Sequence, residues 1–182
     1  MRWFTVLSSD RRRSRSLTLV ALVVLAGLLV AYGSVALATP PSGVTSLPIA
    51  KGRFGDIDAK SKTDTDPSTR TDFWQATIKT KGSSDLEVLQ NTIAPGGTFG
   101  WHSHPGPSLV IVKSGTASLY MADDPTCTAH VFATGSGFVD SGGDVHVVRN
   151  EGDVDLVVVV ASLIPAGATR RIDQPNPGNC PF

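Results

Sequence analysis

The sequence predicts an all-β domain. From Phe73 onward it consists of short runs rich in β-branched and aromatic residues, which clusters of Gly, Pro and Asp interrupt at intervals of about 8 to 12 residues. None of these runs keeps the period of about 3.6 residues that an amphipathic helix requires. The 18 Gly and 12 Pro among 182 residues also favour turns and short strands. We therefore expect one all-β sandwich or barrel.

The expected strands follow one another closely, and the gaps between them contain Gly, Pro or Asp, as turns require. They cover residues 74–79, 85–93, 98–103, 108–113, 116–121, 128–133, 145–149 and 154–163. The segment before them, residues 39–72, is rich in Pro, Ser, Thr, Lys and Asp and is expected to be a polar linker or leader. The domain would then extend over residues 73–182.

The charges of the chain are unevenly spread. Sixteen Lys and Arg residues balance sixteen Asp and Glu residues, which argues against a nucleic-acid-binding protein. Five of the arginines, however, lie within the first fifteen residues: Arg2, Arg11, Arg12, Arg13 and Arg15. Without residues 1–38, the other 144 residues contain eleven basic and fifteen acidic residues, a net charge of −4. The domain itself is therefore mildly acidic.

The N-terminal segment is typical of an export signal. Behind the arginines, residues 17–38 contain no charged residue and end in Val35-Ala36-Leu37-Ala38, a small-x-small pattern. We expect residues 1–38 to be a signal peptide that is removed after Ala38. The alternative is an uncleaved membrane anchor, because about 20 apolar residues can span a bilayer. In either case we expect the domain to lie outside the cytoplasm.

The two cysteines agree with export. Cys127 and Cys180 both lie in the domain, and an even number of cysteines in an oxidising compartment is most simply a disulfide. Such a bridge would tie the C-terminal end to the middle of the domain. The alternative is a pair of free thiols.

The candidate chemistry lies in the histidines, all four of which fall between residues 102 and 146. On a strand, His102 and His104 would project to the same face about 7 Å apart. An antiparallel return could bring His146, on a later expected strand, beside them. Three neutral imidazoles suit one divalent Fe, Mn, Ni, Cu or Zn ion, and an all-nitrogen set argues against Mg or Ca.

Two spaced motifs resemble those of the cupin family. The first is Gly96, five residues, His102-x-His104, three residues, Ser108, six residues and Gly115. The second is Gly135, five residues, Ser141, then Gly143, two residues, His146, three residues and Asn150. The chain departs from the family pattern at Ser108, where the family usually has Glu, and at Ser141, where it usually has Pro.

The resemblance implies a cupin-type conical β-barrel, a double-stranded β-helix or jelly roll, of about six to eight strands. It also implies that His102, His104 and His146 are metal ligands near the barrel mouth. The family's glutamate would be a fourth ligand, so Ser108 is expected to leave a coordination position free on the substrate side. Neutral histidines do not compensate the charge of a divalent ion, and this should draw water or an anionic substrate to that position.

Other residues receive weaker assignments. Tyr120 and Phe138 either line the pocket or are ordinary core aromatics. His130 is expected at the surface or behind the ligands, and Trp101 is expected to face away from the metal. Trp74 is expected in the core or at an edge. The turn carboxylates are interpreted as solvated: Asp123, Asp124, Asp140 and Asp144. Arg170-Arg171 could pair with an acidic loop or meet an anionic ligand.

The function expected from these residues is an exported metal-binding cupin, an oxygenase-like enzyme that acts on a small molecule at a three-histidine divalent metal site. Its ligand count is similar to that of the thiol dioxygenases and some diketone-cleaving enzymes. The alternatives are a non-catalytic module that binds a small ligand or the metal, and a scaffold without an ion. Catalytic residues are not assigned. No nucleic-acid partner is expected, membrane contact is expected only if the N-terminal segment stays uncleaved, and a homodimer is expected by analogy.

Overall fold

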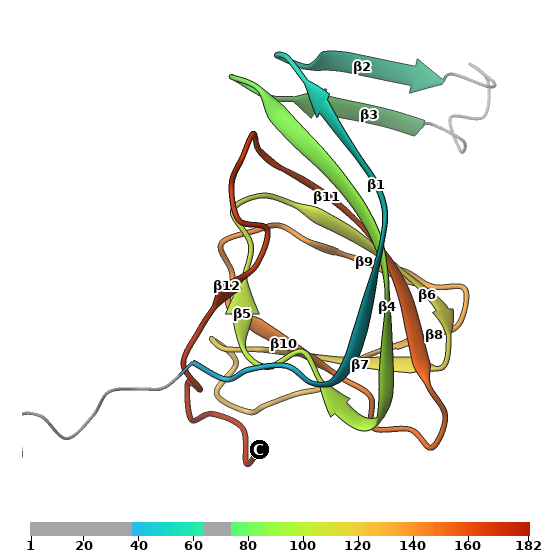
Figure 1. The fold of residues 1–182 in the computed structure, drawn as a ribbon, viewed down its shortest axis with the longest axis vertical. Coiled ribbons are helices and arrows are strands. Elements are labelled where there is room, and N and C mark those ends of the chain that lie inside the picture. Colours follow the sequence, from blue (N-terminus) through green and yellow to red (C-terminus); the bar gives the residue numbers. More distant parts are fainter. Residues whose placement is uncertain (1–37, 64–73) are drawn as a thin grey trace, which may run out of the picture. The chain divides into compact units, whose positions relative to one another are not determined.

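The structure is a computed structural model that describes residues 38–63 and 74–182. These residues form strands and the turns that connect them, and the described ranges contain no helix (Figure 1). The all-β prediction is therefore confirmed. The expected signal peptide or anchor, residues 1–38, lies outside the described residues except for Ala38. Within the described ranges, no helix is long and apolar enough to cross a membrane.

The described residues form one ten-stranded sheet and one two-stranded sheet. The main sheet contains β1 (Ser42–Phe54), β4 (Ser84–Thr98), β5 (His102–Ser103), β6 (Ser108–Ser114), β7 (Thr116–Met121), β8 (His130–Ala133), β9 (Gly137–Asp140), β10 (His146–Arg149), β11 (Leu156–Pro165) and β12 (Ile172–Asp173). The smaller sheet pairs β2 (Asp58–Thr63) with β3 (Trp74–Lys79).

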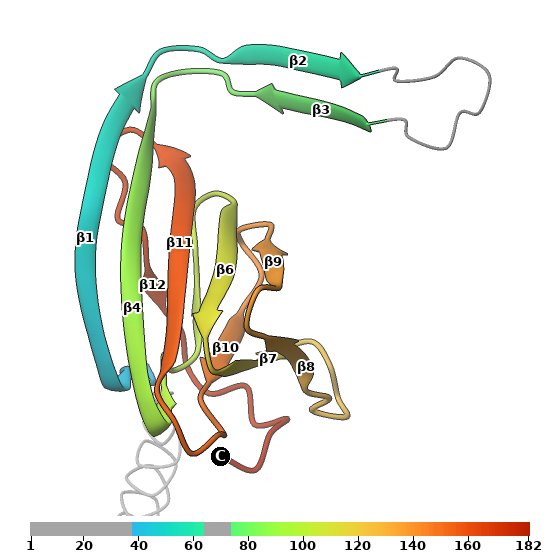
Figure 2. The same cartoon turned by 90° about the vertical axis from the view of Figure 1, so that its right-hand side faces the viewer.

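The main sheet curls into a barrel (Figures 1 and 2). Its principal path is β12-β5-β10-β4-β11-β6-β9, while β1 pairs with β4, and β7 pairs with both β10 and β8. All of these pairings are antiparallel. This architecture confirms the expected cupin-type β-barrel.

The apolar residues of the strands meet inside the barrel. Along β11, burial alternates as the two-residue period of a strand requires, so that Leu156, Val158 and Val160 face inward and their neighbours are less buried. The principal core consists of buried aliphatic residues from several strands: Leu89, Ile93, Val110, Val112, Ala117, Val148, Leu156, Val158 and Val160.

The expected polar linker contains a strand. Residues 42–54 form β1, which pairs with β4 from Ser42↔Thr98 to Phe54↔Ser84. The linker prediction was wrong here because an edge strand needs few buried side chains: most β1 side chains are exposed, including Leu47 and Ile49, and only Val44 packs against the principal core. Pro48 stands at a register shift, where a residue without an N–H is tolerated. Residues 64–73 lie outside the described ranges.

Two further strands differ from the expectation. Residues 98–103 were expected as one strand, but β4 ends at Thr98 and β5 comprises only His102–Ser103. Gly100, at φ +68°, lies between them, and a Cβ there would come within 2.0 Å of Thr39 O. The strand β9, at 137–140, was not predicted, because its four residues directly follow a glycine-rich turn.

A second cluster of buried residues lies under the C-terminal tail. It contains Trp101, Tyr120, Val147 and Cys180, with Phe182 packed against it. Trp101 does face away from the histidines, as predicted, but the tail leaves only 2% of it exposed. The expected disulfide between Cys127 and Cys180 is present, with an S–S distance of 2.00 Å. The bridge therefore holds the tail against the barrel.

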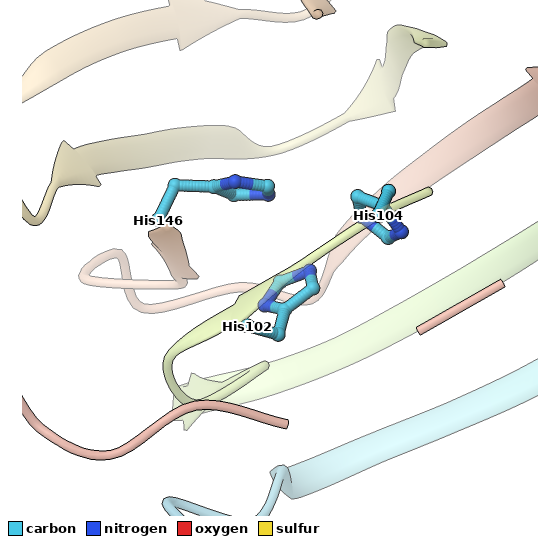
Figure 3. A group of neighbouring side chains, drawn as sticks. All are labelled: His102, His104 and His146. Atoms are coloured by element: carbon cyan, nitrogen blue, oxygen red, sulfur yellow. The ribbon is translucent and has the colours of Figure 1, made fainter. Parts of the chain in front are cut away.

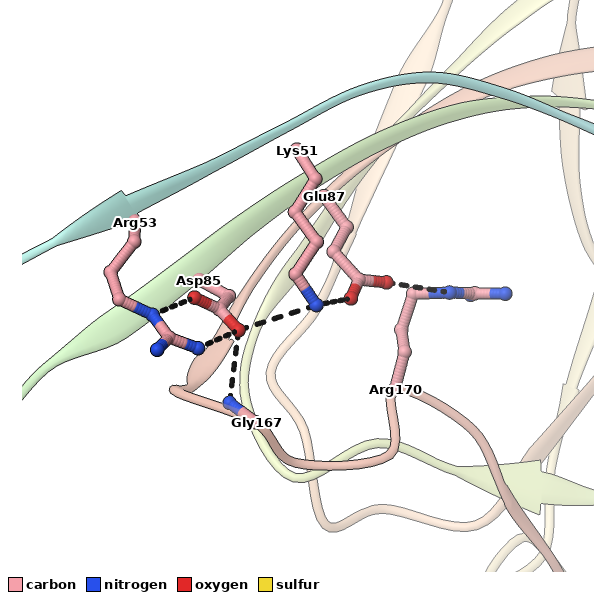
Figure 4. Close-up of polar contacts among 6 residues, drawn as sticks. All are labelled: Lys51, Arg53, Asp85, Glu87, Gly167 and Arg170. Atoms are coloured by element: carbon pink, nitrogen blue, oxygen red, sulfur yellow. Dashed lines mark hydrogen bonds and ion pairs between the residues drawn. The ribbon is translucent and has the colours of Figure 1, made fainter.

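Asp85 joins β1, β4 and the turn after β11 (Figure 4). Its carboxylate accepts hydrogen bonds from Arg53 Nε at 2.8 Å, Arg53 Nη2 at 3.0 Å and the Gly167 N–H at 2.9 Å. Lys51 Nζ lies 3.3 Å from Asp85 Oδ2. Chiefly because of the hydrogen bonds from Arg53, and then that from Gly167, the pKa of Asp85 lies well below its usual range.

Replacing Cys127 and Cys180 together by serine should lower the free energy of unfolding by about 4 kcal/mol, because the bridge spans 53 residues. Urea denaturation of the wild type, the double variant and the reduced wild type measures this difference. The reduced wild type should match the double variant. A loss below about 1 kcal/mol would show that packing alone holds the tail.

Asp85→Asn should destabilise the protein at pH 7, and the loss should shrink at low pH. A carboxyl whose pKa is lowered by folding contributes stability above its unfolded-state pKa of about 3.9, and this contribution is lost as the pH falls towards the native value. Urea denaturation at pH 7 and pH 3 compares Asp85→Asn with the wild type. Asp58→Asn, an exposed carboxylate on β2, is the control. A difference independent of pH would contradict this account.

Candidate metal centre

The structure brings the three predicted histidines together inside the barrel (Figure 3). His102 on β5 is the direct cross-strand partner of His146 on β10, and His104 follows two residues after His102. Their ring centroids are 4.4 to 5.5 Å apart. All three residues are at least nine-tenths buried, and one nitrogen from each lies within 4.8 Å of the others.

Each imidazole is oriented by the main chain. Nδ1 lies within hydrogen-bond distance of a backbone carbonyl oxygen in every case: 2.8 Å from Gly100 for His102, 2.6 Å from Arg170 for His104, and 3.0 Å from Asp144 for His146. A carbonyl oxygen can only accept, so Nδ1 carries the proton and Nε2 keeps its lone pair. Such partners fix the ring and the tautomer of a metal-binding histidine.

The environment also favours neutral imidazoles. Burial, followed by electrostatic repulsion from His146 and Arg171, lowers the pKa of His102 to about 2. Burial also lowers the pKa of His104, although its bond to the Arg170 carbonyl and the charge of Asp140 oppose this shift. Both rings are therefore unprotonated at neutral pH, which is the form that binds a metal ion.

A buried carboxylate completes the cluster. Asp140 was expected to be a solvated turn residue, but it is the last residue of β9 and only 8% exposed. Its Oδ2 lies 3.4 Å from His104 Nε2 and 3.8 Å from His146 Nε2. The prediction was wrong because β9 was not recognised. The missing motif carboxylate at Ser108 was a signal to search the neighbouring strands for a replacement.

Ser108 faces the interior, as expected, but its hydroxyl has a partner. It is 1% exposed, lines the cavity beside the histidines, and shares a 2.7 Å hydrogen bond with Ser162 Oγ. Ser108 on β6 is also the cross-strand partner of Asp140 on β9. The serine and the buried carboxylate therefore occupy adjacent positions on the inner face.

A cavity of about 100 Å³ opens onto the three histidines. Phe138 lines it, together with Asp140, Arg170 and Arg171. Tyr120, the other aromatic pocket candidate, does not line this cavity. It packs in the cluster under the tail, and its hydroxyl donates to the Glu151 carboxylate.

The other assigned residues lie away from the cavity. His130 is exposed at the start of β8, as expected for a residue outside the ligand set. Trp74 is 57% exposed on β3, a strand of the two-stranded sheet, so of the two expected positions it takes the edge and not the core. Among the expected turn carboxylates, Asp124 accepts hydrogen bonds from the backbone N–H groups of Thr126 and Thr128.

Comparison with known proteins matches part of this chain to a family. Residues 90–162, which include all three histidines and Asp140, match the family model described as "Cupin domain". No curated protein matches the chain.

Solved structures similar to this chain belong to proteins of several kinds. An uncharacterized conserved protein with a double-stranded β-helix domain from Klebsiella pneumoniae is 21% identical, at a TM-score of 0.41 over 49% of this chain and 75% of that one. The polyketide cyclase RemF from Streptomyces resistomycificus is 15% identical, with a TM-score of 0.42 over 50% of this chain and 64% of that one. The cupin domain of an XRE family transcriptional regulator from Enterobacter cloacae is 14% identical, with a TM-score of 0.40 over 66% of this chain and 96% of that one.

Proposed function

Residues 90–162 match the cupin domain, and from this premise we propose that the protein is an exported, metal-dependent enzyme of the oxygenase type that acts on a small molecule. The observation that carries the proposal is the arrangement of His102, His104 and His146. One ring nitrogen from each of the three buried histidines lies within 4.8 Å of the others, and each ring is held by a backbone carbonyl. Neutral imidazoles in this arrangement suit a divalent metal.

The donor set favours a transition metal. Imidazole nitrogen binds Fe, Mn, Ni, Cu and Zn well, whereas Mg and Ca prefer sites built from oxygen ligands. A bound ion of this class would supply Lewis acidity, and Fe, Mn or Cu would add one-electron chemistry. The protein's contribution would be to hold the three rings, through the carbonyl groups of Gly100, Asp144 and Arg170.

The cavity walls support small-molecule chemistry. Phe138, Val110 and Val158 give the cavity an apolar side that limits the access of water, while the histidines and two arginines line its polar side. Small-molecule sites combine such apolar walls with a few placed polar groups. A substrate bound here would lie directly beside the imidazoles.

Two features support the export part of the proposal. The first is the signal-like pattern of residues 1–38. The second is the Cys127–Cys180 bridge, because disulfides persist in oxidising compartments and are rare in the cytosol. The homodimer expected by analogy stays a prediction.

The purified protein should bind close to one equivalent of a divalent transition metal, measured by elemental analysis after reconstitution. His104→Ala should reduce the bound metal several-fold with little change in the thermal midpoint, because the principal core does not include this residue. His130→Ala, which changes an exposed histidine, is the matched control and should keep its metal. Less than one-tenth of an equivalent in the wild type would overturn the proposal.

Oxygen uptake separates catalysis from binding. The metal-loaded protein is tested in an oxygen electrode with a panel of thiols, diketones and phenols, beside His104→Ala. Consumption that depends on both substrate and His104 supports the oxygenase reading. Metal binding without consumption on any of the three classes would favour the non-catalytic binding module.

A further inference from the structure

Asp140 has one carboxyl oxygen in the interior without a hydrogen-bond partner among the described residues. Its side chain is 6% exposed, and its Oδ2 is one of the buried polar atoms in the described part of the chain that have no hydrogen-bond partner. A buried carboxylate oxygen without a hydrogen-bond donor is costly. A cation or a charged donor beside this oxygen would offset that cost.

The two ring nitrogens nearest to Oδ2 do not donate to it when their imidazoles are neutral. The nearest are His104 Nε2 at 3.4 Å and His146 Nε2 at 3.8 Å. Both rings have Nδ1 against a carbonyl, so in the neutral form their Nε2 atoms are acceptors. A carboxylate oxygen and two imidazole lone pairs that converge without a donor repel one another. One cation between them would satisfy all three.

The spacing fits ligands of a single ion. Two ligands that each lie about 2.1 Å from one ion at a tetrahedral angle are about 3.4 Å from each other. The distances from Oδ2 to His104 and His146 are 3.4 Å and 3.8 Å. A carboxylate further adds the negative charge that three neutral imidazoles lack.

The carboxylate of Asp140 comes from β9, which pairs with β6, the strand where the cupin motif would place a glutamate. Asp140 on β9 is directly opposite Ser108 on β6, and directly opposite residues of an antiparallel pair project from the same face with Cβ atoms about 4.5–5.5 Å apart. A longer side chain at residue 108 and the aspartate at residue 140 could therefore reach the same point. Ser108 instead bonds to Ser162, which leaves that point to Asp140.

The turn after β9 holds the carboxylate in place. Asp140 Oδ1 accepts a hydrogen bond of 2.9 Å from the Gly142 N–H, so only Oδ2 is left for the interior. Gly142 has φ +82°, and a Cβ there would lie 2.7 Å from the Gly106 backbone. This turn accepts only glycine and fixes the direction of the side chain.

We propose that Asp140 Oδ2 is the fourth protein ligand of the metal, in the role that the cupin motif gives to a glutamate at the position of Ser108. This inference rests on the proposed metal binding by the three histidines. The coordination position that the sequence leaves free at Ser108 is then filled from β9. The protein ligands carry one negative charge rather than none.

Calorimetric titration with Co²⁺ and the visible spectrum of the Co²⁺ protein test this assignment. Asp140→Asn should weaken Co²⁺ binding at least about tenfold, since even residues behind the ligands contribute that much, and should change the ligand-field bands. Asp153→Asn, which alters an exposed acid in the loop after β10, should change neither. Ser108→Glu in the Asp140→Asn background should restore the affinity, because it returns the carboxylate from the opposite strand.

Two outcomes would overturn the assignment, and they are distinguishable. If Asp140→Asn keeps the wild-type affinity and spectrum, Asp140 is not a ligand, while metal binding by the histidines stands. If the wild type binds no Co²⁺, both the metal site and the assignment fail. Thermal melting of each variant shows whether the variant is folded. Restored affinity in the variant that combines Ser108→Glu with Asp140→Asn would exclude unfolding as the cause of weak binding by Asp140→Asn.

A second observation concerns Arg171, which lines the same cavity just before β12. Its Nε donates to Asp173 Oδ1 at 2.6 Å. Its Nη2, in contrast, is buried without a hydrogen-bond partner within the described ranges. A guanidinium is always charged, and its planar donors match the two oxygens of a carboxylate. A buried guanidinium donor without a partner is costly, and the place of Arg171 in the cavity wall points to an anionic ligand.

We infer that Arg171 binds a carboxylate group of the substrate, so that the substrate class is small organic acids. The inference rests on the proposed function only in placing the substrate in this cavity, since Arg171 would attract a carboxylate with or without the metal. Arg170 adds a second positive charge at the wall, although Glu87 lies 3.8 Å from its Nε.

Malonate and its neutral counterpart malonamide are suitable probes, titrated calorimetrically into both metal-free and metal-loaded protein. Arg171→Gln should weaken malonate binding about tenfold or more, the effect of one charge-assisted hydrogen bond. Arg171→Lys should retain part of the affinity, and Lys81→Gln, which changes an exposed lysine, should retain all of it. Equal malonate affinity in the wild type and Arg171→Gln, or malonamide binding as tight as malonate, would overturn the inference.

Discussion

The candidate site depends on the register of β5 against β10, which places His102 directly opposite His146. Side chains alternate between the faces of a strand, so a slip of one residue would turn one of these rings out of the barrel. The register is shared with neighbouring strands, because β10 also pairs with β7 over four residues and β12 pairs with β5. Two short strands and the residue that follows β5 thus hold three buried imidazoles, because the neighbouring strands fix the register of β5 and β10.

Whether the site contains a carboxylate depends on which side chains share the inner face of the sheet, and not on one position in the sequence. Ser108 and Asp140 are neighbours across β6 and β9, so the inner surface can keep a carboxylate near the histidines although residue 108 has none. The Ser108–Ser162 hydrogen bond satisfies the two hydroxyl groups that remain on the inner faces of β6 and β11. Pairing between strands therefore allows a change at one position to be offset at another that is 32 residues away in the chain.

The C-terminal tail contributes to the site from a distance in sequence. The Arg170 carbonyl orients His104, and Arg171 lines the cavity. The tail is held by the β5–β12 pairing, by the hydrogen bond from Gln174 N to Trp101 O and by the Cys127–Cys180 bridge. The disulfide therefore links the stability of the domain to the geometry of one candidate metal ligand and of one cavity arginine.

The sequence by itself determined the all-β class, most strand positions, the three histidines and the cysteine pair. These features follow from local periodicity and from the spacing of a few residue types. Only the tertiary structure decided that Asp140 is buried, that Tyr120 lies outside the cavity and that residues 42–54 form an edge strand. The physical reason is the same in each case: whether a polar or aromatic side chain is solvated or enclosed depends on what pairs with its strand and covers it, and those partners are distant in the chain.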